Sequence, residues 1–162
     1  MRKALFYAVT AVLLLILQSV FVKFIEIRGV MPDFFLTVLV YLSLMRGEFY
    51  GMNFGFFSGL VADVFSAGPF GAGALVRTIM GYVTGLFHRK LDAGNRVTQF
   101  GLVLFFAFFD YWVMYLMRLF LKGEDAGGFL LPSFIYALYC GMLAPFVFTL
   151  FSAWERLWRM DG

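Results

Sequence analysis

The sequence predicts an all-α integral membrane protein, a six-helix transmembrane bundle forming a single polytopic domain over residues 1–162. Hydrophobic residues make up 62% of the chain and charged residues only 14%, and the mean hydropathy is +0.87. A water-soluble chain of this size has too little interior to cover so much apolar surface. Apolar runs of helix length, separated by short polar segments, fill nearly the whole sequence. This pattern is typical of consecutive membrane helices.

The first expected helix covers residues 4–22. Arg2 and Lys3 precede a run of 19 uncharged residues, and about 20 apolar residues span a hydrocarbon core of roughly 30 Å. The run is long for a signal peptide, and no small-residue cleavage site follows it. We therefore expect these residues to stay in the mature protein as a helix.

The second expected helix covers residues 32–47. Pro32 and Asp33 open it, and both residue types are favoured in a first helical turn. Only twelve residues separate Asp33 from Arg46, which is roughly 18 Å of helix. We expect this short helix to cross the membrane with its flanks included and Arg46 extended toward the headgroups. The alternative is a segment that enters the membrane without crossing it.

The third and fourth expected helices, residues 49–65 and 70–87, are joined by a break at residues 66–69 that contains Gly68-Pro69. Small or acidic side chains recur every four residues on the third helix and share one face. Glycines at this spacing let another helix backbone approach closely in a membrane. The face either packs inside the protein's own bundle or receives a helix of another protein. The residues assigned to helix packing or partner binding are Gly51, Gly55, Gly59, Asp63 and Gly71.

The last two expected helices cover residues 97–121 and 129–154. If all six segments cross, most Lys and Arg residues fall on the side of the two termini. By the positive-inside rule, both termini of this multi-pass protein are cytoplasmic. That side holds Arg2, Lys3, Arg46, Arg89, Lys90, Arg96, Arg156 and Arg159, whereas Lys23, Arg28 and Lys122 lie on the other.

Three charged residues lie inside apolar helices: Asp63, Arg77 and Asp110. Each would cost about 2.5 to 3.5 kcal/mol at the centre of a membrane helix, so none should face lipid. We expect a buried charge network in which Arg77 pairs with one of the aspartates and fixes the register of the helices. A substrate or proton site is the alternative.

The residues offer little chemistry for other functions. The single cysteine, Cys140, and the single histidine, His88, are too few for a metal cluster or a cysteine triad. No HExxH or GxxxxGK[ST] motif occurs. The basic residues gather at helix ends, where they meet membrane lipids, which argues against nucleic-acid binding. We therefore expect a protein that is not an enzyme and has no metal or cofactor.

An ordered set of residues in the middle of the chain resembles the MreD family of rod shape-determining proteins. The resemblance is most specific over residues 32–87 and rests on Pro32-Asp33, Gly51, Gly55-Phe56, Gly59, Asp63, Ser66, Gly71 and Leu75. It implies a non-enzymatic scaffold of the bacterial cell-elongation complex, in the cytoplasmic (inner) membrane. The implied partners are MreC, the actin-like MreB and peptidoglycan synthases. The implied fold is similar to the substrate-binding subunits of energy-coupling-factor transporters.

The resemblance therefore predicts a protein that binds MreC and helps to couple the cytoskeleton to lateral peptidoglycan synthesis and rod shape. The alternative is a solute-binding membrane subunit of a vitamin-type transporter. That alternative would use Arg77, Asp110 and Gln99 as a polar pocket and would need a separate energy-coupling subunit, because this chain has no nucleotide-binding motif.

Overall fold

The computed structural model describes residues 33–65, 70–88, 90–91, 94–122 and 130–160. Over these residues the chain forms five α-helices, so the all-α class is confirmed for this part of the protein. They are α2 (Phe34–Arg46), α3 (Glu48–Phe65), α4 (Ala72–Leu86), α5 (Arg96–Lys122) and α6 (Leu130–Met160). The helix expected over residues 4–22 lies outside the described residues.

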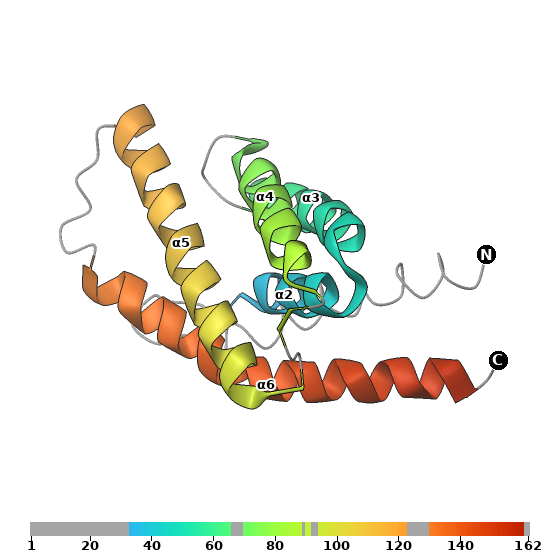
Figure 1. The fold of residues 1–162 in the computed structure, drawn as a ribbon. Helices are drawn as coiled ribbons and strands as arrows, with labels where there is room; N and C mark the ends of the chain where they lie inside the picture. Colours follow the sequence, from blue (N-terminus) through green and yellow to red (C-terminus); the bar gives the residue numbers. More distant parts are fainter. Residues whose placement is uncertain (1–32, 66–69, 89, 92–93, 123–129, 161–162) are drawn as a thin grey trace.

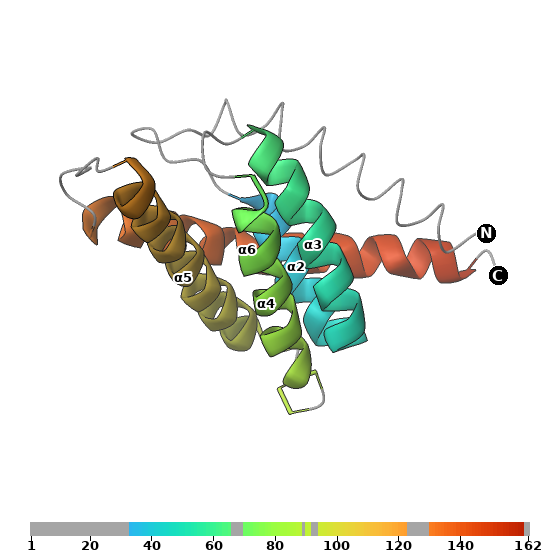
Figure 2. The ribbon, with the colours of Figure 1, turned by 90° about the horizontal axis from the view of Figure 1, so that it is seen from above.

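The central helix is α2, which lies among the other four described helices (Figures 1 and 2) and contacts each of them. Every residue from Phe35 to Leu44 is buried. A helix that is apolar on all sides is expected in such an interior position. Helix α2 is thus both short and buried on every side.

Local interactions set both ends of α2. The Asp33 side chain accepts the N–H of Leu36 at 3.1 Å and so caps the first turn. The helix stops at Gly47, whose φ of 88° is favourable for glycine and ends helical hydrogen bonding. Beyond this point, Nδ1 of His88 donates to the carbonyl oxygen of Leu44, which ties the segment after α4 to the end of α2.

The remaining helices pack as two pairs around α2. Helices α3 and α4 lie side by side in both views, and α5 crosses and contacts α6 (Figures 1 and 2). A smaller contact joins α4 to α5. The contact between α4 and α5 therefore links the α3–α4 pair to the α5–α6 pair.

Two of the described helices, α5 over Arg96–Met117 and α6 over Leu130–Trp154, are long and apolar enough to cross a membrane. Large apolar side chains also remain exposed on α3 to α6. Exposed apolar surface of this extent is unusual for a protein in water and suits contact with hydrocarbon. Examples are Phe49, Phe57, Ile79, Phe105, Phe120 and Phe146.

Most helix boundaries lie within two residues of the expected ones, and two of the differences have a clear cause. The helix expected from residue 70 begins at Ala72, because Gly71 has a positive φ of 95° and cannot belong to a right-handed helix. The helix expected to end at residue 154 continues to Met160. Its last six residues are rich in charge, so hydropathy alone placed the end too early.

Candidate functional site: a glycine contact and a buried ion cluster

Glycines of α3 bring its backbone against the backbone of α4. A Cβ atom added to Gly55 would lie 2.7 Å from the carbonyl carbon of Arg77. One added to Gly59 would lie 2.6 Å from the backbone nitrogen of Ala74. Such distances are well inside van der Waals contact, so neither position accommodates a side chain unless a helix moves. The glycine face of α3 is therefore occupied by α4.

The contact is reciprocal, because α4 also presents glycines to its neighbours. Gly51 and Gly81 face each other, and a Cβ on Gly51 would lie 2.5 Å from the carbonyl oxygen of Gly81. One turn further along α4, a Cβ on Gly85 would lie 2.8 Å from the carbonyl carbon of Gly47. Backbone approach of this kind increases van der Waals contact where the hydrophobic effect does not drive association.

Asp63, near the end of α3, binds the start of α4. Its Oδ1 accepts the N–H of Gly73 at 3.0 Å, and its Oδ2 accepts the N–H groups of Gly71 at 2.9 Å and Ala74 at 3.1 Å. The first N–H groups of a helix have no partner within the helix and attract negative charge. The buried Asp63 carboxylate thus satisfies three backbone donors that the helix itself leaves free.

Gly71 is required for its backbone conformation. It occupies the N-cap position of α4 with φ 95° and ψ −15°, and a Cβ there would meet no atom within 4 Å. Only glycine adopts such angles without strain. Gly71 therefore differs from the glycines of α3, which are needed for lack of space.

Arg77 of α4 lies at the centre of a buried ion cluster with Asp33 and Asp110. Its Nη2 donates to Oδ2 of Asp33, at the start of α2. Its Nε lies 3.9 Å from Oδ1 of Asp110 on α5. Arg77 is 4% exposed and Asp110 is 5% exposed, so both charges are removed from bulk solvent. The cluster joins α2, α4 and α5.

The structure changes the membership of the expected charge network. Arg77 was expected to pair with Asp63 or Asp110, and it lies beside Asp110. Asp33 is a further partner of Arg77 that was not expected. The sequence pattern assigned Asp33 only to the first turn of its helix. Asp63, expected in the network, is hydrogen-bonded to backbone N–H groups instead. The available signal was that Asp33, like Asp63, stands next to an apolar run.

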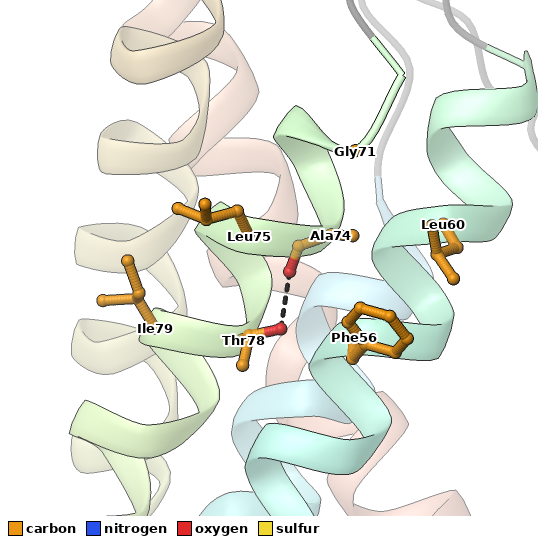
Figure 3. A pocket seen from close by; sticks show the side chains of 7 residues that line it. All are labelled: Phe56, Leu60, Gly71, Ala74, Leu75, Thr78 and Ile79. Atoms are coloured by element: carbon orange, nitrogen blue, oxygen red, sulfur yellow. Dashed lines mark hydrogen bonds between the residues drawn. The ribbon is translucent and has the colours of Figure 1, made fainter.

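An open groove of about 360 Å³ lies between the outer faces of α3 and α4 (Figure 3). Phe56 and Leu60 contribute from α3, and Leu75 and Ile79 from α4. The hydroxyl of Thr78, which also lines the groove, donates to the carbonyl oxygen of Ala74 at 2.6 Å. The groove has an apolar lining and is unsuited to a charged solute. It is lined by Phe56, Leu60, Gly71, Ala74, Leu75, Thr78 and Ile79.

Two further residues with reactive or polar side chains, Gln99 and Cys140, lie outside the ion cluster. Gln99 is distant from the cluster, and Cys140 is buried next to it. Gln99 lies eleven residues before Asp110 on α5, roughly 16 Å along the helix axis. Cys140 of α6 is fully buried and its Sγ accepts the N–H of Asp33 at 3.4 Å. Within the described ranges, no group of three or more His, Cys, Asp or Glu residues is arranged to hold a metal ion.

Comparison with known proteins matches residues 1–154 to the family model of the rod shape-determining protein MreD. Neither the curated proteins nor the solved structures gave a match. The matched range contains the α3–α4 glycines, Asp63 and the whole ion cluster. The family is a shape-determining one and is not known as a family of enzymes, and the apolar helices α5 and α6 fit a membrane protein. The chain belongs to the MreD family of rod shape-determining proteins.

Proposed function

We propose that this protein is a non-enzymatic scaffold of the bacterial cell-elongation complex in the inner membrane. It binds MreC and helps to couple MreB to the peptidoglycan synthases of lateral wall growth. The observation that carries the proposal is the match of residues 1–154 to a family that determines rod shape.

The proposal includes the membrane arrangement. The chain crosses the membrane six times, and both termini are cytoplasmic. The distribution of Lys and Arg between the two sets of loops supports this orientation. We retain the likeness to substrate-binding subunits of energy-coupling-factor transporters as part of this proposal about the fold.

Within this scaffold, we assign Gly51, Gly55, Gly59, Asp63 and Gly71 to the integrity of the α3–α4 pair. The glycine face of α3 is filled by α4, so a partner's helix cannot occupy the same face while this contact exists. Disruption of the pair would then remove partner binding indirectly, through the shape of the scaffold. The close approach of α4 to this face supports internal packing as the role of these glycines.

Co-purification from native membranes tests the proposal. The tagged protein is solubilised in detergent, and bound proteins and small molecules are identified by mass spectrometry. We expect MreC and enzymes of wall synthesis to be recovered. Recovery of an energy-coupling ATPase and a vitamin, without MreC, would overturn the proposal in favour of the solute-binding subunit.

A matched pair of variants separates the role of the glycine contact from a general effect of bulk. Gly55→Leu places a side chain against the backbone of α4, whereas Gly101→Leu adds the same side chain in α5 where no atom lies within 4 Å. We expect Gly55→Leu to lower the yield of folded protein and of bound MreC together. Gly101→Leu should keep both, and equal MreC recovery per folded molecule in the two variants would identify the effect as one of folding.

The geometry gives the solute-binding alternative little support. It requires Arg77, Asp110 and Gln99 in one pocket, but Gln99 lies about three helical turns from Asp110. The groove of Figure 3 has an apolar lining that includes none of these residues. We therefore treat solute binding only as the alternative result that the co-purification would detect.

A further inference from the structure

The ion cluster leaves three buried polar atoms without hydrogen-bond partners. Nε and Nη1 of Arg77 and Oδ1 of Asp110 make no hydrogen bond within the described part of the chain. Buried polar atoms are nearly always hydrogen-bonded to protein or to ordered water, and unpaired charged atoms are the costliest exceptions. Arg77 uses Nη2 to reach Asp33, and Nε is its unpaired atom that lies near Asp110.

The distance between two of these atoms restricts what can satisfy them. Nε of Arg77 and Oδ1 of Asp110 are 3.9 Å apart. That is too long for a direct hydrogen bond, which requires about 2.7 to 3.2 Å. It is short enough for a single oxygen to lie at about 2.8 Å from both atoms. A group that bridges Nε and Oδ1 therefore places a single heavy atom between them.

The chemistry of the two atoms restricts the group further. The guanidinium N–H needs an acceptor, whereas the carboxylate oxygen needs a donor. An anion would be repelled by Asp110, and a metal cation would be repelled by Arg77. A water molecule both accepts and donates, and buried waters typically satisfy polar groups of this kind.

We infer that one ordered water molecule bridges Nε of Arg77 and Oδ1 of Asp110, in a hydration site at the contact between α4 and α5. Arg77 is thus bound directly to Asp33 at the start of α2, but indirectly to Asp110 of α5. A water-mediated bond keeps both charges satisfied over a wider range of separations than a direct one. The contact between α4 and α5 therefore does not require a direct hydrogen bond between these two side chains.

Water-to-guanidinium NMR on the full chain in lipid nanodiscs tests the inference. The protein carries ¹⁵N-arginine, and the Nε–H signal of Arg77 is assigned by its disappearance in Arg77→Lys. We expect this signal to show a cross-peak to water with the sign of dipolar transfer, which in a rotating-frame experiment is opposite to that of chemical exchange. If the unmodified protein shows the Arg77 Nε–H signal without a dipolar cross-peak to water, the inference is overturned. This result would not depend on the behaviour of any variant.

Two substitutions of Asp110 provide matched controls. Asp110→Glu lengthens the side chain by one methylene group, which lets the carboxylate reach Nε directly and expel the water. We expect the Nε–H signal to persist and its water cross-peak to disappear. Asp110→Asn keeps an acceptor oxygen at the same distance and should keep the cross-peak. An unchanged cross-peak in a folded Asp110→Glu protein would contradict the bridging position.

Discussion

The carboxylate of Asp63, near the end of α3, accepts the backbone N–H of Gly73 in the first turn of α4 at 3.0 Å. Together with the bonds to Gly71 and Ala74, this makes an acidic side chain of one helix the cap of the next. The Asp63 side chain therefore ties the start of α4 to the end of α3. The relationship explains an aspartate buried inside an apolar helix without invoking catalysis.

We expect Asp63→Ala to destabilise the protein by about 2 to 3 kcal/mol, since a lost cap and unsatisfied buried N–H groups each cost about 1 kcal/mol or more. Asp63→Asn should cost less, because the amide oxygen still accepts. Unfolding in mixed micelles with increasing denaturing detergent measures both. Glu48→Gln, at an exposed carboxylate of the same helix, is the control. Equal stability of Asp63→Ala and the control would contradict the capping role.

Gly59→Ala should destabilise the protein by about 1 to 3 kcal/mol, because the added Cβ must push α3 away from the backbone of Ala74. Gly101→Ala makes the same chemical change in open space and should be neutral or stabilise by up to about 1 kcal/mol through helix propensity. The two variants are compared in the same unfolding assay. A stabilising Gly59→Ala would mean that α3 and α4 are not in backbone contact.

Gly71→Val should cost about 1 to 3 kcal/mol through backbone strain alone, because the residue has a positive φ but free space around its Cα. Gly71→Asn should cost less, since asparagine tolerates the left-handed region better than a β-branched residue. Thermal unfolding of the two variants gives the comparison. If valine and asparagine were equally tolerated, the conformation at Gly71 would not be the one described.

Double-mutant cycles should show stronger coupling of Arg77 to Asp33 than to Asp110. The first pair has a direct hydrogen bond, whereas the second is separated by 3.9 Å. We expect about 1 to 3 kcal/mol for Arg77–Asp33 and less for Arg77–Asp110. The cycles use Arg77→Met with Asp33→Asn or Asp110→Asn, and asparagine retains the N-cap at residue 33.

Single variants in these cycles carry their own expectation. Arg77→Met leaves the buried Asp110 carboxylate and the partly buried Asp33 carboxylate without their cation and should cost about 3 to 5 kcal/mol. Folding of Arg77→Met with unchanged stability would show that the cluster contributes nothing to the native state. A larger coupling to Asp110 than to Asp33 would reverse the assignment of the direct partner.

Local pattern alone predicted the all-helical class, the approximate positions of the five described helices and the common face of Gly51, Gly55 and Gly59. Composition and helical period are properties of neighbouring residues, so they can be read along the chain. The same reasoning placed Asp63, Arg77 and Asp110 away from lipid, and all three are buried. The resemblance to the MreD family was likewise carried by residues in linear order, and the family match confirmed it.

Tertiary structure decided which surfaces meet. The period of α3 identifies its glycine face, but only packing shows that this face meets the backbone of α4 at Arg77 and Ala74. Asp33 and Arg77 are 44 residues apart, and no local signal joins them. Asp63 binds N–H groups that are free only because α4 begins beside it. Sequence period fixes the direction of a side chain relative to its own helix, whereas its partner depends on how all the helices pack together.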